Sequence, residues 1–140
     1  MKTSKIKIMF IASISMIILF FLALSVYKEY QERKTILVTS VIDGDTFEIE
    51  TGEKVRLICI NTPEFNETGY EEAKLFLSEL VLNKKVRLEK DISDKDSYGR
   101  LLRYVYLNDV FVNKEIVQKN LGVIFPYGND TKRCDEIAVR

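Results

Sequence analysis

Three carboxylates and one arginine lie at the ends of two short apolar segments in the first half of the chain: Asp43, Asp45, Arg56 and Glu64. The first two belong to Asp43-Gly44-Asp45, and the last follows Asn61-Thr62-Pro63. If the two segments pair as a hairpin, these ends can come together. Carboxylates bind hard cations and arginine binds phosphates. The spacing therefore predicts a site for a hard cation and a phosphate.

The pattern of apolar and polar residues along the chain predicts the strands and helices that position these residues. Apolar β-branched runs and alternating apolar and polar residues predict strands, and a 3.6-residue apolar period predicts a helix. Thr68 and Glu71 suggest a capping box for the first helix of the domain, and Asn113 suggests an N-cap for the next. We expect strands at 36–42, 46–50, 54–60, 84–90 and 101–107, and helices at 69–82, 113–120 and 130–140.

This order of elements is that of a small barrel. Five strands with a helix between the third and the fourth are the pattern of the oligonucleotide-binding (OB) fold, a partly open barrel. The fold class is therefore α+β, mainly β, with about three helices in residues 35–140. The last helical stretch is short and polar.

The N-terminal segment differs in composition from the rest. Lys2, Lys5 and Lys7 precede an apolar run at 8–26 in which only three serines are polar. About 19 residues of this kind can cross a bilayer as a helix. We therefore expect a signal anchor or signal peptide in residues 1–27, followed by a charged linker at 28–34.

Both fates of this segment remain open. The length of the apolar run favours a retained anchor at 8–26, whereas Ala23-Leu24-Ser25 offers a cleavage site for a secreted form. Lysines that precede a span favour a cytoplasmic N-terminus. We therefore expect the domain to be extracytoplasmic, either membrane-anchored or secreted.

The charge of the remaining chain restricts how it can bind nucleic acid. Beyond Val26 there are 21 acidic residues against 18 basic ones, a formal charge of −3. A broad basic surface is thereby excluded. Any chemistry on nucleic acid must depend on a local site with a metal ion.

Two residue types limit the chemistry further. The chain has no histidine, from which we expect neither a zinc site nor histidine-based acid, base or nucleophilic catalysis. Cys59 lies within an apolar run and Cys134 in a polar segment, without metal-ligand spacing. An export compartment would permit a disulfide between them, but we expect Cys59 to be an unbonded core residue.

Three motifs together resemble those of the staphylococcal nuclease (thermonuclease) family. The likeness covers about residues 35–122, and all three motifs occur in order and at compatible spacing. They are Ile42-Asp43-Gly44-Asp45-Thr46-Phe47, Val55-Arg56-Leu57 followed by Asn61-Thr62-Pro63-Glu64, and the run from Asp96 to Val105 that contains Tyr98-Gly99-Arg100.

The resemblance implies a calcium-dependent phosphodiesterase. Such an enzyme cleaves DNA and RNA at the bond to the 5′ oxygen and leaves 3′-phosphate ends. Arg56 and Arg100 would grip the scissile phosphate, and Glu64 would activate or orient the attacking water. The implied calcium ligands are Asp45, the side chain of Asn61 and the backbone carbonyl of Thr62, with Asp43 in the outer shell; Tyr98 and Tyr127 would contact the nucleotide. We expect a monomer.

Two departures from the family pattern leave a second hypothesis open. The family usually has an aspartate where this chain has Asn61, so calcium should bind more weakly. The last helix is also shorter than in the family. The alternative is therefore a catalytically weakened OB-fold module that binds single-stranded nucleic acid or a protein partner.

Overall fold

Residues 2–32 and 34–138 are described by the structure, a computed structural model of the 140-residue chain. Within the first helix, side chains are described only at 13–27, 29 and 30. The chain divides into two units, at 1–34 and 35–140.

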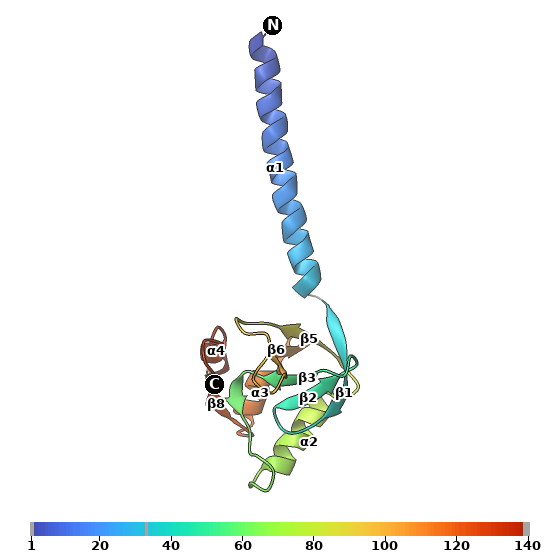
Figure 1. The fold of residues 1–140 in the computed structure, drawn as a ribbon, viewed down its shortest axis with the longest axis vertical. Coiled ribbons are helices and arrows are strands. Elements are labelled where there is room, and N and C mark those ends of the chain that lie inside the picture. Colours follow the sequence, from blue (N-terminus) through green and yellow to red (C-terminus); the bar gives the residue numbers. More distant parts are fainter. Residues whose placement is uncertain (1, 33, 139–140) are drawn as a thin grey trace. The chain divides into compact units, whose positions relative to one another are not determined.

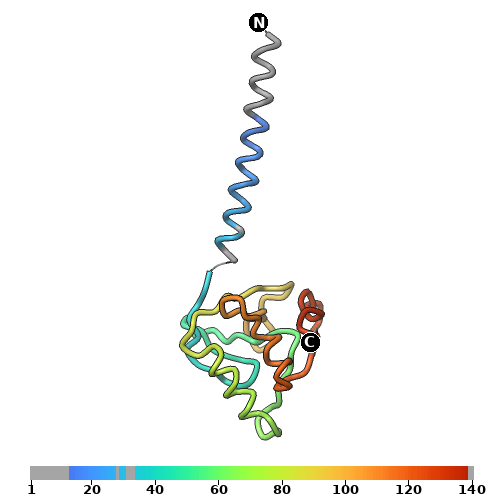
Figure 2. Tube along the Cα trace, turned by 180° about the vertical axis from the view of Figure 1, so that it is seen from behind, coloured from blue at the N-terminus to red at the C-terminus, as the bar shows by residue number. Residues whose placement is uncertain are grey.

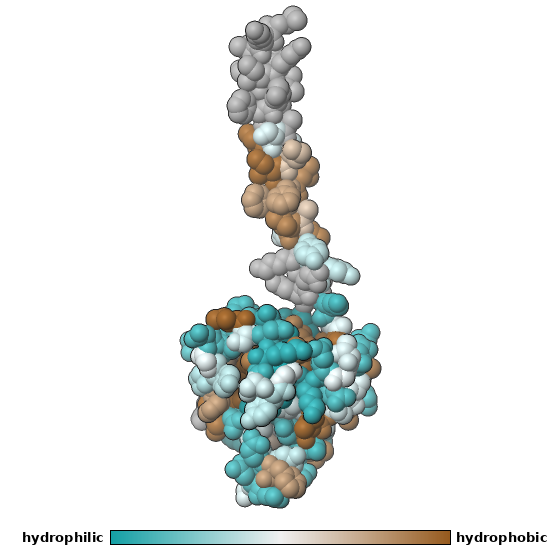
Figure 3. Space-filling view, viewed as in Figure 1, coloured by the Kyte–Doolittle hydropathy of each residue, from teal (hydrophilic) through white to brown (hydrophobic). Residues whose placement is uncertain are grey.

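The first unit contains one helix, α1 (Lys2–Glu32). Its described side chains form a predominantly hydrophobic surface in Figure 3. Among the side chains that the structure describes, no helix combines the length and apolar character needed to cross a membrane. Residues 8–12 of the predicted anchor lie outside these described side chains.

The second unit is built on a closed five-stranded barrel (Figure 1). Antiparallel pairings join β1 to β2 and β5, β2 to β3, and β5 to β6, and a parallel pairing of β3 with β6 closes the barrel. This closure confirms the OB-fold prediction. The barrel strands are β1 (Thr35–Val41), β2 (Thr46–Ile49), β3 (Lys54–Leu57), β5 (Lys85–Glu89) and β6 (Leu101–Leu107), and β7 (Val110–Phe111) extends the sheet.

Helices cover the core of this barrel (Figure 2). Helix α2 (Tyr70–Val81) buries Ala73, Leu77 and Val81, which recur at helical spacing. Helix α3 (Val112–Gln118) contacts α2, β6 and the short helix α4 (Cys134–Ala138). The predicted helices are thus present, although α4 is shorter than expected within the described residues.

The predicted third strand is interrupted. The structure divides it into β3 and β4 (Cys59–Asn61), because Cys59 has a φ of 64° that turns the chain out of the barrel. Strand β4 then pairs with β8 (Val123–Phe125) in a separate two-stranded sheet. The segment that precedes Glu64 therefore leaves the barrel instead of continuing its third strand.

Both predicted helix caps are wrong. Helix α2 begins after Gly69, whose φ of 93° suits glycine, and has no side-chain cap from Thr68. Asn113 lies inside α3 and is fully buried. Its amide accepts a hydrogen bond from Val105 N and donates one to Ile58 O, both at 2.9 Å. A buried amide needs such partners, so Asn113 links α3 to two strands.

The prediction of an unbonded Cys59 is also wrong. Cys59 and Cys134 form a disulfide, with their Cα atoms 5.3 Å apart. The positive φ at Cys59 ends β3, and α4 brings Cys134 to the same place. The disulfide therefore joins the segment beside the predicted site to the C-terminal helix.

Candidate active site

The loop from Asp43 to Thr46 presents the first carboxylates of the site. Asp43 closes the turn, because its Oδ1 accepts a hydrogen bond from Asp45 N at 3.0 Å. Gly44 is required there, since a Cβ would lie 2.6 Å from Ala73 Cβ and 2.8 Å from Thr62 Oγ1. The loop thereby packs against α2 and brings Asp45 to the end of β4.

Asp45 is buried, and both of its carboxylate oxygens are engaged. Oδ1 lies 3.0 Å from Arg56 Nε and accepts a hydrogen bond from Thr46 Oγ1 at 3.1 Å. Oδ2 accepts hydrogen bonds from Thr62 N at 3.0 Å and from Thr62 Oγ1 at 3.1 Å. Each oxygen therefore has two partners, which fix the orientation of the carboxylate.

The Arg56 guanidinium is surrounded by protein oxygen atoms. It is on β3 directly opposite Thr46 of β2, and its side chain is 13% exposed. Besides Asp45, it donates from Nη1 to Leu57 O and to Ile60 O, the latter at 3.0 Å, and from Nη2 to Asn61 Oδ1 at 3.0 Å. These carbonyls flank the break between β3 and β4, so the guanidinium also stabilises that break.

Burial disfavours the charged forms of both Asp45 and Arg56, and each charge stabilises the other. Burial raises the pKa of the Asp45 carboxyl, and nearby Asp43 adds to the rise while Arg56 opposes it. Burial also lowers the pKa of Arg56, an effect that Asp45 opposes and Arg100 reinforces. Arginine nevertheless remains protonated at neutral pH. The site thus holds a buried ion pair with a second cation close by.

Asp96 orients the Arg100 side chain through an ion pair. Its Nε lies 2.7 Å from Asp96 Oδ2, and its Nη1 lies 3.4 Å from Thr46 Oγ1. Asp96 Oδ1 also accepts hydrogen bonds from the backbone of Tyr98 and Arg100. Burial would raise the pKa of Asp96, but the bonds from Arg100 outweigh it and keep that pKa below its usual value.

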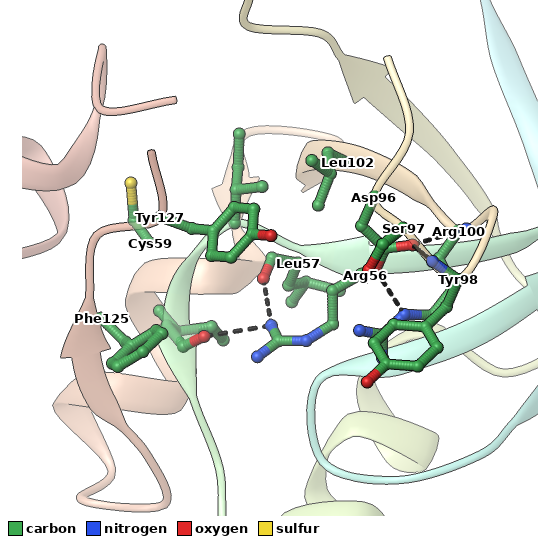
Figure 4. Close-up of a pocket in the computed structure, with 12 residues that line it drawn as sticks. Arg56, Leu57, Cys59, Asp96, Ser97, Tyr98, Arg100, Leu102, Phe125 and Tyr127 are labelled. Atoms are coloured by element: carbon green, nitrogen blue, oxygen red, sulfur yellow. Dashed lines mark hydrogen bonds and ion pairs between the residues drawn. The ribbon is translucent and has the colours of Figure 1, made fainter. Parts of the chain in front are cut away.

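Two adjoining cavities share Tyr98 and Arg100. The first, of about 160 Å³, is mainly apolar and is lined by Arg56, Leu102, Phe125 and Tyr127 among others (Figure 4). The second, of about 410 Å³, is lined by Ile42, Asp43, Thr46, Lys54, Glu64, Tyr98 and Arg100. In Figure 4 the Arg56 guanidinium lies between the Phe125 side and the Tyr98 side of the first cavity.

The tyrosines predicted to contact the nucleotide and the glutamate predicted to activate water are all accessible to solvent. Tyr98 is 84% exposed, and its ring centroid is 5.4 Å from Arg100 Cζ. Tyr127 is half exposed at the other end of the first cavity. Glu64 is exposed and lines the second cavity. The residues predicted to contact the phosphate, the attacking water and the nucleotide thus line two adjoining cavities.

The predicted metal ligands suit a hard cation by their chemistry. A carboxylate, an amide oxygen and a carbonyl are the donors that calcium prefers, and Asp45, Asn61 and Thr62 supply them at adjoining positions. However, oxygens of Asp45 and Asn61 contact Arg56 in this structure. Within the described residues, no three acidic or cysteine side chains form a metal cluster. A cation bound to these oxygens would therefore compete with Arg56.

Three residues of the site were not singled out from the sequence. Asp96 orients Arg100, Thr46 contacts both Asp45 and Arg100, and Lys54 lines the second cavity. Strand alternation offers a signal for Lys54, because positions 54 and 56 lie on the same face of β3. The sequence next to Arg100 also contains Asp96, but four residues of separation in a loop do not predict a contact.

The fold is a closed OB-fold barrel, and two arginines, a buried carboxylate and an exposed glutamate lie around its two adjoining cavities. A sequence model described as "Staphylococcal nuclease homologue" matches residues 54–138. The chain belongs to the staphylococcal nuclease family.

Individual relatives agree with this assignment. The chain is 38% identical over 98 residues to the protein named Thermonuclease of Staphylococcus intermedius, which covers 64% of this chain and 58% of that protein. It is 36% identical over 118 residues to Endonuclease YncB of Bacillus subtilis (strain 168), covering 75% of this chain and 56% of the relative. The chain thus spans a little over half the length of these relatives.

Proposed function

We propose that this protein is a calcium-dependent nuclease that hydrolyses phosphodiester bonds of DNA and RNA and leaves 3′-phosphate ends. The observation that carries the proposal is the shared cavity in which Glu64 and Arg100 face the same space, beside the Asp45–Arg56 pair. Relatives named thermonuclease and endonuclease support the same activity.

The residues of the site divide the reaction between them. Arg100 and Arg56 hold the scissile phosphate and stabilise the charge that builds on its oxygens. Glu64 orients the attacking water and accepts its proton as the new oxygen–phosphorus bond forms. The bond from phosphorus to the 5′ oxygen breaks, and that oxygen leaves as a hydroxyl after it takes a proton from solvent water.

Calcium bound by Asp45, Asn61 and the Thr62 carbonyl would supply positive charge beside the phosphate. Asp43 holds Asp45 through the turn, and its charge would add to the attraction for the ion from the outer shell. Tyr98 and Tyr127 offer ring faces on which bases stack without sequence preference. This arrangement accounts for a substrate range that includes both DNA and RNA.

The test is breakdown of single-stranded DNA and RNA by the full chain with calcium, and again with a chelator of calcium. We expect cleavage only with calcium, and end-group analysis should find 3′-phosphates. Arg100→Lys should lower kcat/KM by about 10²–10³-fold, because a point charge does not replace a planar fork. Equal cleavage with and without the chelator would refute calcium dependence, and absence of cleavage in both would refute the activity.

One observation favours the alternative, an OB-fold module that binds single-stranded nucleic acid or a protein partner with little cleavage. Asn61 brings no charge to the metal site, and its oxygen accepts a hydrogen bond from Arg56. If the alternative holds, the protein should bind oligonucleotides while its cleavage rate stays at background at all calcium concentrations.

We further propose that the domain acts outside the cytoplasm. The Cys59–Cys134 disulfide supports this location, because such bonds persist in oxidising compartments. The lysines before the apolar run at 8–26 support the same orientation. Fractionation of cells should find the full chain in membranes if the segment is a retained anchor, and a shortened protein in the medium if it is a cleaved signal. Recovery only from the cytosol would contradict export.

A further inference from the structure

Lys54 is a cation at the edge of the proposed active site that takes no part in the proposed chemistry. It is the first residue of β3 and is exposed. Side chains two positions apart on a strand share a face, so Lys54 and Arg56 lie on the same face of β3. Lys54 lines the second cavity together with Arg100 and Tyr98.

The neighbouring cations are all paired with carboxylates, whereas Lys54 is not. Lys95 lies 3.1 Å from Glu53, Arg100 lies 2.7 Å from Asp96, and Arg103 lies 2.7 Å from Asp94. In the described part of the chain, no hydrogen bond or ion pair engages the Lys54 ammonium. Glu48, its cross-strand neighbour on β2, forms no ion pair with it there either. Lys54 thus keeps three donors for a ligand.

The other charges of the cavity determine what that ligand is. Asp43 and Glu64 also line it, but they belong to the metal and water side of the proposed site. Arg100 is assigned to the scissile phosphate. A strand of nucleic acid held at Arg100 carries further phosphates on either side, and an unpaired ammonium beside Arg100 is suited to bind one of them.

We propose that Lys54 binds a second phosphate of the substrate strand, next to the one that is cleaved. This inference rests on the proposed nuclease function and defines its substrate class. The protein prefers strands with at least two successive phosphates to a dinucleotide with a single phosphodiester. Lys54 is a positioning residue, because it contacts the substrate away from the reacting atoms.

The test measures binding in the absence of cleavage. A full-length Glu64→Gln protein is the parent, and fluorescence anisotropy in calcium buffer compares a labelled thymidine octanucleotide with a labelled thymidine dinucleotide. Lys54→Gln should weaken octanucleotide binding and leave dinucleotide binding unchanged. The slope of log affinity against log salt should fall in magnitude by about 0.7, the value for one phosphate contact on a single strand. Lys54→Arg should retain most of the affinity.

Lys85 provides a matched control. It is an exposed lysine on β5, has no ion pair among the described residues and lines neither cavity. Lys85→Gln should leave both affinity and slope unchanged. An octanucleotide slope that is the same in the parent and Lys54→Gln, or that falls equally in Lys85→Gln, would overturn the Lys54 site alone. A parent that binds neither probe would overturn the proposed function as well.

Discussion

Arg56 and Arg100 differ in how many hydrogen-bond donors remain for a substrate. A guanidinium has five N–H donors. In Arg56, Nε, both hydrogens of Nη1 and one of Nη2 face protein oxygens. In Arg100, only Nε and Nη1 have partners among the described residues. Arg100 therefore offers a free edge to a phosphate, whereas Arg56 must release Asp45 or Asn61 to offer a complete fork.

The competition between Arg56 and calcium gives a prediction at this site. Arg56→Met removes the cation that occupies the oxygens of Asp45 and Asn61, so calcium should bind more tightly. Without calcium, Asp45 loses its partner in a buried position, and the free energy of unfolding should fall by about 3 kcal/mol. Calcium should recover much of that loss through linkage. Calorimetric titration of calcium and melting temperatures with and without calcium measure both effects.

Arg100→Met is the control for this prediction, because Arg100 contacts neither Asp45 nor Asn61. It should leave calcium affinity close to that of the unmodified protein. The competition would be disproved by an Arg56→Met protein that binds calcium no more tightly than the Arg100→Met protein.

At the level of elements, the sequence predicted the barrel but not its departures from regularity. Strand periodicity and turn residues locate the five barrel strands because each strand buries one face. The break at Cys59 has no such signal, since residues 55–60 are apolar throughout except for Arg56. It is fixed by tertiary contacts, such as the hydrogen bonds from Arg56 and Asn113 to carbonyls around the break.

Tertiary contacts, which the sequence pattern does not reveal, also explain why the predictions for Asn113 and Cys59 were wrong. Asparagine is favoured at N-caps because its side chain bonds to nearby backbone, yet here the partners of Asn113 come from other elements. Asp43, Asp45 and Glu64 were singled out from the residues because they follow apolar segments, and Arg56 because a charge within an apolar strand needs a partner. The role of Arg100 came only from the family resemblance. Their partners, such as Asp96 for Arg100, depend on loop geometry that spacing does not determine.

The attachment of the C-terminal segment to β5 gives a prediction about pH. Glu89 on β5 lies 3.0 Å from both Arg133 Nε and Lys132 Nζ. Burial would raise the pKa of Glu89, but hydrogen bonds from these two cations hold it below its ordinary value of 4.5. A carboxyl with a lowered pKa stabilises the fold above its unfolded pKa, and this contribution is lost as pH falls through the folded pKa.

Glu89→Gln should therefore lower the melting temperature at pH 7, and the difference from the unmodified protein should shrink progressively below about pH 4.5. Lys90→Gln is a suitable control, since among the described residues Lys90 pairs only with exposed Asp94, at 3.7 Å. If Glu89→Gln lowers the melting temperature equally at pH 3 and pH 7, the ion pairs of Glu89 do not contribute to the stability of the fold.

At the scale of the whole domain, the disulfide anchors helix α4 to β4. Helix α4 buries only Cys134 and Ile137. It contacts α3 and β8, and β8 in turn pairs with β4, next to Asn61 and Thr62. The Cys59–Cys134 bond closes a loop with a sequence separation of 75 residues, so it restricts the unfolded chain strongly. Stability and the geometry of the proposed metal site are thereby linked.

Removal of this bond should destabilise the domain by about 2–4 kcal/mol. The double variant Cys59→Ala with Cys134→Ala should show this loss in denaturant unfolding, and a reducing agent should lower the melting temperature of the unmodified protein but not that of the variant. The bond joins β4 to α4, and α4 contacts β8, the strand that precedes Tyr127. The variant should therefore also bind the octanucleotide more weakly at temperatures where it is still folded. A reducing agent that leaves the melting temperature of the unmodified protein unchanged would show that the bond does not hold α4 in place.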